Sequence, residues 1–237
     1  MYSGKINFKN KKNEYNAGLY IIEDCNFEDL NNINTYLHKE EIEKYLSLKV
    51  DAVKQRFCLG RYCGKRAIAL INKTFKPNEI LITNGLFGEP VVKNLPGIQC
   101  SITHRHTSGA ALSFSNELMM GIDLENIDDE QVQNIRTQLT EKELELKKKS
   151  DLNEKAFCFL LWTSKESLAK TIRTGFTVPM ELFEIENLIK TGKEMNIVYK
   201  YFKQFTTKCF ITDTLSISIT YPVFLEWDMP LDLINSF

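Results

Sequence analysis

Two helical stretches of the chain carry the same residue types at an offset of 102 positions, and this repeat constrains the fold more than any other feature. The matched positions need no gap, so they predict two similar α+β halves, residues 1–105 and residues 106–237. Such halves usually pack about a pseudo-two-fold axis and leave a ligand cleft between them. Helical segments also share residue types by chance, which is the alternative interpretation. The matched pairs are Leu37 and Leu139, Glu41 and Glu143, Glu43 and Glu145, Phe57 and Phe159, Leu59 and Leu161, and Ala67 and Ala169.

The composition is that of a globular protein able to bury a core, since 43% of the 237 residues are hydrophobic and 26% are charged. The formal net charge of −1 argues against a protein that binds nucleic acid through bulk positive charge. Apolar runs are too short to cross a membrane, and Met1 to Lys5 lack the apolar core of a signal peptide. We therefore expect a cytoplasmic protein. We also expect a monomer, because the internal repeat supplies the interface that oligomers otherwise make.

The cysteines are scattered and contain no Cys-x-x-Cys pair. Most have apolar neighbours, so we expect buried, reduced thiols rather than disulfides or zinc ligands. The six positions are Cys25, Cys58, Cys63, Cys100, Cys158 and Cys209.

Hydrophobic periodicity and turn residues predict how helices and strands alternate. Residues 37–71 have a helical pattern, in which Arg61 and Lys65 are expected to be solvated. The polar turn at residues 115–117 predicts that residues 109–125 form a hairpin. Thr140 with Glu143 has the pattern of a capping box that opens a helix. Further elements are expected at 80–83, 98–104 and 210–223 as strands, and at 154–172 as a helix.

The first motif that carries chemistry is Gly121-Ile122-Asp123-Leu124-Glu125. In a strand, Asp123 and Glu125 project from the same side, and two carboxylates on one face repel unless a cation lies between them. Such hard oxygen ligands suit Mg²⁺. Gly121 removes a side chain where a ligand or a backbone needs to approach. The alternative is a solvated sheet edge with incidental acids.

The second motif runs from Trp162 through Lys165 and Glu166 to Lys170. Trp162, Glu166 and Lys170 are spaced four apart and form one stripe of a helix. An ordinary surface ion pair between Glu166 and Lys170 would contribute only about 0.3–0.5 kcal/mol. The apolar neighbours at 156–161 instead predict a largely buried helix, in which a carboxylate needs a partner or a metal. Glu166 then supplies a third metal ligand, while Lys165 and Lys170 neutralise phosphate oxygens.

The ordered pair of motifs resembles the signature of the 4′-phosphopantetheinyl transferases, in particular the Sfp-type single-chain branch. That family carries a G-[IV]-D-x-E strand, followed further along by a W-x-x-K-E-[SA]-x-x-K helix. The segment from Arg56 to Arg61 also resembles the family's R-x-x-L-G helix. Phe87 to Pro90 resembles its G-K-P loop, and Ser101 to His104 its N-x-S-H strand. The resemblance covers roughly residues 37–175, and it implies a fold of two similar α+β halves with the active site between them.

This resemblance implies an enzyme that transfers the phosphopantetheine arm of coenzyme A to a serine of an apo acyl or peptidyl carrier protein, releasing adenosine 3′,5′-bisphosphate. The metal, Mg²⁺, would be held on the diphosphate by Asp123, Glu125 and Glu166. Lys165 and Lys170 would lie beside the diphosphate. The 3′-phosphate and nearby ribose would be contacted by His104, Thr103, Arg56 and Lys44. The catalytic groups implied are Glu166, Lys170 and Asp123.

Three departures from the family pattern affect parts of this assignment. Glu89 stands where the family often has Lys, which puts an acid near the expected adenine or phosphate region. Thr103 replaces the usual Ser. His104 is followed by Arg105 and His106, so this segment carries additional positive charge. Glu166, directly or through a water, is the candidate that takes the serine proton, although a carboxylate bound to metal is a weak base.

Two other functions remain open from the sequence. A non-catalytic module on the same fold would bind coenzyme A or a carrier protein without turnover. A different magnesium-dependent nucleotide enzyme on an unrelated fold would explain the acidic motifs, but not His104, the Gly-Pro loop and the repeat together. The pathway of the carrier, whether fatty acid, polyketide or nonribosomal peptide, is not indicated.

Overall fold

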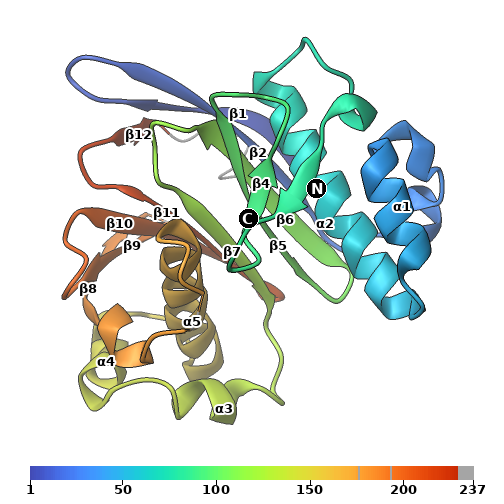
Figure 1. Cartoon of the computed structure of the whole chain (residues 1–237). Helices are drawn as coiled ribbons and strands as arrows, with labels where there is room; N and C mark the ends of the chain where they lie inside the picture. Colours follow the sequence, from blue (N-terminus) through green and yellow to red (C-terminus); the bar gives the residue numbers. More distant parts are fainter. Residues whose placement is uncertain (176, 193, 229–237) are drawn as a thin grey trace. The chain divides into compact units, whose positions relative to one another are not determined.

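The computed structural model of the chain describes residues 1–175, 177–192 and 194–228, and it consists of two compact units (Figure 1). The first unit contains Met1–Leu118 and the short strand that begins at Glu226. The second unit contains the described residues from Met119 to Leu225. The division thus falls after Leu118, whereas the repeat predicted a boundary after residue 105.

The first unit is built on an antiparallel sheet with the strand order β12-β1-β2-β6-β5, and α2 packs against β2, β5 and β6 (Figure 1). A separate ribbon is formed by β3 and β4. The strands are β1 (Tyr2–Lys9), β2 (Glu14–Ile22), β3 (Ile82–Asn84), β4 (Pro90–Val92), β5 (Ile98–Arg105), β6 (Ser108–Ser115) and β12 (Glu226–Asp228), and the helices are α1 (Lys39–Ser47) and α2 (Asp51–Ile71).

The helix predicted over residues 37–71 is interrupted between α1 and α2. Leu48 and Val50 have extended backbones, with ψ angles of 135° and 124°. The hydroxyl of Ser47 donates to the Lys44 carbonyl at 2.6 Å, a local hydrogen bond that competes with helix continuation. The β-branched Val50 then precedes Asp51, where α2 begins.

The second unit has a sheet with the strand order β7-β11-β10-β9-β8, and α5 packs against β7, β10 and β11. The predicted helix at 154–172 is confirmed by α5, and the predicted capping box is present at the start of α4. The strands are β7 (Gly121–Asn126), β8 (Ile185–Thr191), β9 (Glu194–Tyr199), β10 (Phe205–Ile211) and β11 (Leu215–Pro222), and the helices are α3 (Val132–Arg136), α4 (Glu141–Glu145) and α5 (Glu154–Thr171).

Two strand predictions differ from the structure, one in its pairing and one in its number of strands. Residues 109–125 do not form a hairpin, because β6 pairs with β5 and β2 while β7 pairs with β11 in the other unit. The segment 210–223 contains parts of two strands, β10 and β11, which pair with each other across a short turn. In both cases the alternation of side chains predicted strands but could not identify their partners.

The contact between α5 and its sheet is unusually rich in hydroxyl groups. The Thr163 hydroxyl oxygen lies 2.9 Å from that of Ser216 and 2.8 Å from that of Ser218. Ser167 and Thr220 make a similar contact at 2.5 Å. All of these side chains are completely buried. Because they are small and fully hydrogen-bonded, the helix backbone comes close to the sheet without leaving polar groups unsatisfied.

The expectation of buried, reduced cysteines is confirmed. All six lie within the described residues, and all are buried free thiols.

None of the helices described up to residue 228 is long and apolar enough to span a bilayer. The mixture of helices and sheets confirms the α+β class, whereas the pseudo-two-fold axis stays a prediction.

Candidate active site

Gly121 determines how closely β7 approaches α5 in the second unit. A Cβ atom on Gly121 would lie 2.4 Å from the carbonyl oxygen of Ser167 and 2.6 Å from the hydroxyl of Thr171. No side chain fits at these distances, so only glycine permits this packing. The expectation of a close approach at Gly121 is therefore confirmed, and the approaching group is the backbone of α5. This packing brings the carboxylates of β7 to the half of α5 that carries Glu166 and Lys170.

Asp123 and Lys170 form an ion pair between β7 and α5. The Nζ atom of Lys170 donates to Oδ1 of Asp123 at 2.6 Å. The Asp123 side chain is only 3% exposed, whereas Lys170 retains 28% of its surface. The cation therefore lies at the solvent-facing side of a buried carboxylate, where it can also meet an anionic ligand.

Glu166 lies within electrostatic range of both carboxylates of the first motif. Burial, followed by the negative charge of Asp123, raises the pKa of Glu166 to about 8; Lys170 lowers it and Glu125 raises it further. Two sequence motifs 41 to 43 residues apart thus contribute to a single electrostatic site. Three carboxylates with one neighbouring ammonium leave an excess of negative charge that favours binding of a cation.

The donor set suits a hard divalent cation, but its arrangement is not that of a formed metal centre. Over residues 1–175, 177–192 and 194–228, no group of three or more His, Cys, Asp or Glu side chains is positioned to hold a metal ion. Oδ1 of Asp123 accepts a hydrogen bond from the ammonium of Lys170. The chemistry of Asp123, Glu125 and Glu166 still fits Mg²⁺, which takes few protein carboxylates and keeps several waters.

Lys165 lies elsewhere than the resemblance implied. Its side chain is completely buried, and its Nζ atom donates to Glu143 at 2.8 Å. The residue points into the interior of the second unit rather than toward Asp123, because consecutive helical residues project about 100° apart. The structure therefore gives no support to Lys165 as a group beside a diphosphate.

The first unit contains a cationic hollow of about 490 Å³ where the start of α2 meets the turn between β5 and β6. Among the described residues that line it, none is acidic. Arginine and histidine side chains grouped in this way suit a phosphate. The lining residues are Phe27, Ala52, Gln55, Arg56, His104, Arg105, His106 and Thr107.

Arg56 and His104 are brought together in this hollow, as expected for a shared ligand, whereas Thr103 and Lys44 are not among its lining residues. Gly60 of α2 allows the approach, because a Cβ atom there would lie 3.2 Å from Cδ2 of His104. Thr103 is buried, and it follows from strand alternation that it faces away from His104. Lys44 is exposed on the last turn of α1.

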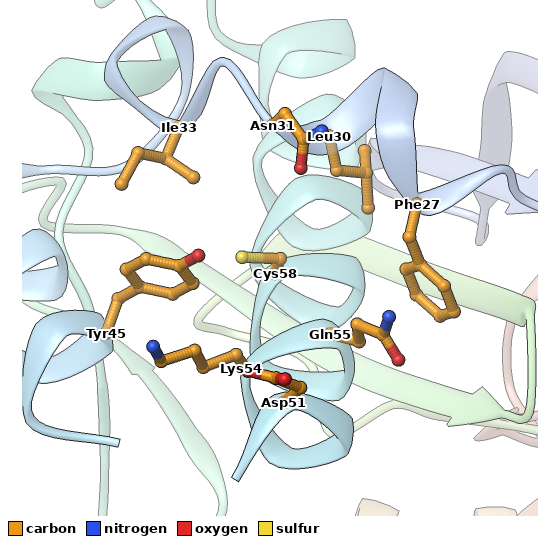
Figure 2. A pocket seen from close by; sticks show the side chains of 9 residues that line it. All are labelled: Phe27, Leu30, Asn31, Ile33, Tyr45, Asp51, Lys54, Gln55 and Cys58. Carbon is orange, nitrogen blue, oxygen red and sulfur yellow. The ribbon is translucent and has the colours of Figure 1, made fainter. Parts of the chain in front are cut away.

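A second hollow of about 190 Å³ lies along α2 beside the cationic one, and the two share Phe27 and Gln55. Figure 2 shows Cys58 pointing into it from α2, on the side of Tyr45. Lys54 lies over the Tyr45 ring, 5.3 Å from its centroid, and Asp51 adds an opposite charge. Its walls combine apolar and polar groups, and its one acidic and one basic residue balance, so it does not share the anion-binding character of its neighbour. Its lining residues are Phe27, Leu30, Asn31, Ile33, Tyr45, Asp51, Lys54, Gln55 and Cys58.

Glu89, which departs from the family pattern, has a local structural role. Its carboxylate accepts a hydrogen bond from the backbone N–H of Phe87 at 2.9 Å, and its carbonyl accepts one from Gly85 at 2.7 Å. The side chain thus closes the turn between β3 and β4. A lysine at this position could not accept the bond from Phe87.

Comparison with protein families agrees with the chemistry of the second unit. Residues 119–219 match the family model described as the 4'-phosphopantetheinyl transferase superfamily. The matched range contains Asp123, Glu125, Glu166 and Lys170. No match to the chain was found among curated proteins. The matched superfamily is one of phosphopantetheinyl transferases, and at the coarse level the match supports phosphopantetheine transfer.

Some of these features were not predicted from the sequence. The role of Phe27 and Gln55 in the cationic hollow was missed, because Gln55 of α2 and Phe27, which precedes α1 in the chain, meet only in the fold. The pairing of Lys165 with Glu143 was also missed, although the repeat matched Glu143 with Glu41. A signal for this pairing was present in the sequence. Glu41 and Glu143 both lie at capping positions, and each is followed by a helix that carries a lysine among apolar residues.

Proposed function

We propose that this protein transfers the 4′-phosphopantetheine arm of coenzyme A to a serine of an apo acyl or peptidyl carrier protein in a Mg²⁺-dependent reaction, leaving adenosine 3′,5′-bisphosphate. The single observation that carries the proposal is the convergence of Asp123, Glu166 and Lys170 on one site. This convergence lies inside the range that matches the transferase superfamily. The cationic hollow of the first unit supports a ligand with a second phosphate.

In this proposal the carboxylates of Asp123, Glu125 and Glu166 hold Mg²⁺. Bound there, the metal supplies Lewis-acid stabilisation of charge on the diphosphate. Lys170 moves from Asp123 to a diphosphate oxygen, because its 28% exposed ammonium already lies at the solvent side of the carboxylates. Its charge then stabilises the oxygens that become more negative as the bond to the departing adenosine bisphosphate breaks.

Arg56 and His104 bind the 3′-phosphate in the cationic hollow, with Arg105 adding positive charge and His106 a further ring nitrogen around it. These contacts orient coenzyme A by a group that does not react, so their binding energy is available for positioning. Lys44 and Thr103, which do not line the hollow, remain weaker candidates for contacts with the same end of the ligand.

The serine of the carrier must lose its proton during attack on phosphorus. Glu166 is the residue we assign to this step, because its carboxyl group lies in the same acidic site as Asp123 and Lys170; a bound Mg²⁺ would hold it in the ionised form that accepts a proton, whereas without metal burial and Asp123 raise its pKa to about 8. The transfer of the proton, directly or through a water, ends with protonated Glu166.

The experiment is incubation of the protein with coenzyme A, MgCl₂ and a panel of apo-carrier proteins, followed by mass spectrometry of the intact carriers. Addition of the arm to at least one carrier supports the proposal. Folded protein that modifies none of the panel contradicts it. Binding of coenzyme A without turnover would instead indicate a binding module. A cytoplasmic monomer is part of the same proposal, and size-exclusion chromatography with light scattering tests the oligomeric state.

A further inference from the structure

One buried carboxylate, Glu143, joins three elements of the second unit. Its Oε2 atom accepts hydrogen bonds from the Thr140 backbone N–H at 2.8 Å and from Nζ of Lys165 at 2.8 Å. Its Oε1 atom accepts one from the Ile185 backbone N–H at 2.9 Å. Both Glu143 and Lys165 have fully buried side chains. The start of α4, the middle of α5 and the start of β8 are therefore fixed to one another by a single ion pair.

The first unit contains a buried ion pair of the same kind, between Glu41 and Lys65. Glu41 accepts a hydrogen bond from the His38 backbone N–H at 2.8 Å and another from Ile82 at 3.1 Å, and it pairs with Nζ of Lys65. Lys65 is completely buried, so the expectation that it is solvated was wrong, and Arg61, which is 12% exposed, also pairs with Glu41. The two ion pairs differ in the residue that follows the buried lysine. Lys65 is followed by Arg66, whereas Lys165 is followed by Glu166 of the acidic site.

Stability alone gives no reason for such a pair. Taking both charges out of water has a large cost, and apolar residues of similar volume often stabilise a fold as well or better. An ion pair with several hydrogen bonds differs from an apolar contact in being directional. It fixes the rotation of a helix about its own axis, whereas apolar side chains pack at a range of angles. On α5 this rotation determines where Glu166 and Lys170 point.

We propose that Glu143 and Lys165 are positioning residues that set the rotation of α5, so that Glu166 and Lys170 face Asp123. They act through Glu166 and Lys170 and need no contact with the substrate. The inference rests on the proposed function of the acidic site for its catalytic consequence. Its structural part concerns only the geometry between α5 and β7, and it can be tested without a reaction.

The structural test is a double-mutant cycle between Asp123 and Lys170, using Asp123→Asn and Lys170→Met in urea unfolding. The cycle is measured in three backgrounds: the natural chain, the Glu143→Gln/Lys165→Met variant, and the matched Glu41→Gln/Lys65→Met variant. We expect the coupling between Asp123 and Lys170 to be lost in the Glu143/Lys165 background and retained in the Glu41/Lys65 background. Retained coupling in both, or loss in both, overturns the inference.

The catalytic test uses the same variants in phosphopantetheine transfer. Misdirected side chains on α5 are expected to lower kcat at least roughly tenfold, with KM for coenzyme A changed less than about twofold. The Glu41/Lys65 variant should keep the natural kcat. Equal losses in both variants would show a general structural effect and overturn the inference. Absence of transfer by the natural chain contradicts the proposed function, while the coupling cycle still decides the positioning role.

If the Glu143/Lys165 variant does not fold, the conservative variant Glu143→Asp decides the question. It keeps both charges but shortens the carboxylate by one methylene group. We expect it to fold, to weaken the coupling between Asp123 and Lys170, and to lower kcat in the same direction. Unchanged coupling in Glu143→Asp overturns the inference.

Discussion

The ammonium of Lys170 contacts Oδ1 of Asp123 at 2.6 Å, across 47 positions of sequence. This contact places a cation from a helix on a carboxylate from the edge strand of its sheet. Glu166 lies one helical turn before Lys170, and its pKa is raised by burial and by Asp123. The two sequence motifs therefore form one electrostatic unit, in which removal of any one charge should change the interaction energies of the remaining charged groups.

Replacement of Asp123 by asparagine should abolish transfer while the protein stays folded. The substitution preserves the size of the side chain but removes the charge that attracts a metal and fixes Lys170. We expect kcat/KM to fall by at least about 100-fold, as when a charge-stabilising group is lost from a transition state. Steady-state transfer assays and circular dichroism measure the two effects. The matched control is Asp151→Asn, which breaks the exposed pair with Lys190 at 2.6 Å and should leave the rate unchanged. Near-natural turnover in Asp123→Asn would contradict the role of this carboxylate.

Replacement of Glu166 by glutamine should stabilise the metal-free protein. The change removes a carboxyl group whose pKa rises from 4.5 to about 8 on folding, which lowers stability above about pH 5, and we expect a gain of about 1 kcal/mol in the free energy of unfolding at pH 7 after solvent screening. The same variant should lose the rise in Tm that MgCl₂ gives the natural protein. Thermal unfolding in EDTA and in MgCl₂ checks both parts. A variant that is less stable in EDTA, yet still responds to Mg²⁺, would be inconsistent with mutual repulsion at this site.

Gly121→Ala should disturb the acidic site through packing. The added methyl group meets the Ser167 carbonyl at 2.4 Å, so β7 and α5 must separate, at a cost of about 1–3 kcal/mol. Transfer should fall together with stability. Gly97→Ala is the control, because its φ of 89° makes alanine strained by about 1–2 kcal/mol although no atom lies within 4 Å of the new Cβ. Urea unfolding and transfer rates distinguish the two variants. When the two have lost a similar amount of stability, only Gly121→Ala should also have lost activity.

The cationic hollow should recognise the 3′-phosphate of coenzyme A. Arg56→Ala and His104→Ala each remove a charge or a hydrogen-bond donor, so we expect KM for coenzyme A to rise roughly tenfold or more, in line with about 1.5–3 kcal/mol per charged hydrogen bond. KM for dephospho-coenzyme A should hardly change. Lys54→Ala, in the neighbouring hollow, serves as the control that alters neither value. Equal effects of Arg56→Ala on both substrates would mean that the hollow binds another part of the ligand.

The cysteines should be unreactive in the folded protein. Burial raises the pKa of the Cys209 thiol to about 11 and also raises the pKa of Cys63. Since the thiolate is the reactive form, Ellman's reagent should modify the native protein slowly at pH 8 and all six thiols after unfolding. A group that holds its proton more tightly when folded makes stability fall as pH rises, here above about 9. Rapid native modification of Cys209 would contradict this account.

The sequence predicted local elements well where capping and periodicity are strong. The capping box of Thr140 and Glu143 and the long helix α5 were correctly identified because their signals lie within a few residues. The pairing of β7 with β11 was not predicted, because the sequence shows that a segment is a strand but not which distant strand completes its hydrogen bonds. The hairpin prediction at 109–125 failed for this reason.

The residues of the candidate site were likewise predicted only in part. Asp123 and Glu166 were recognised from motif spacing, and their convergence follows from the packing of α5 on β7. Lys165 was expected beside the ligand because a lysine ammonium suits a phosphate. The direction of its side chain is set by its position on α5, one residue before Glu166, and that position points it to Glu143. Its partner Glu143 becomes visible only when α4 and α5 are placed together.

The most direct measurement is the intact mass of an apo-carrier protein after incubation with this protein and coenzyme A. Our account predicts that the carrier gains one phosphopantetheine arm when MgCl₂ is present, but not in EDTA or with the Asp123→Asn variant. A carrier that gains the arm equally in EDTA, or equally with Asp123→Asn, would contradict the acidic site as the metal-dependent centre. Failure of every carrier to gain mass with folded, natural protein would contradict the proposed transfer itself.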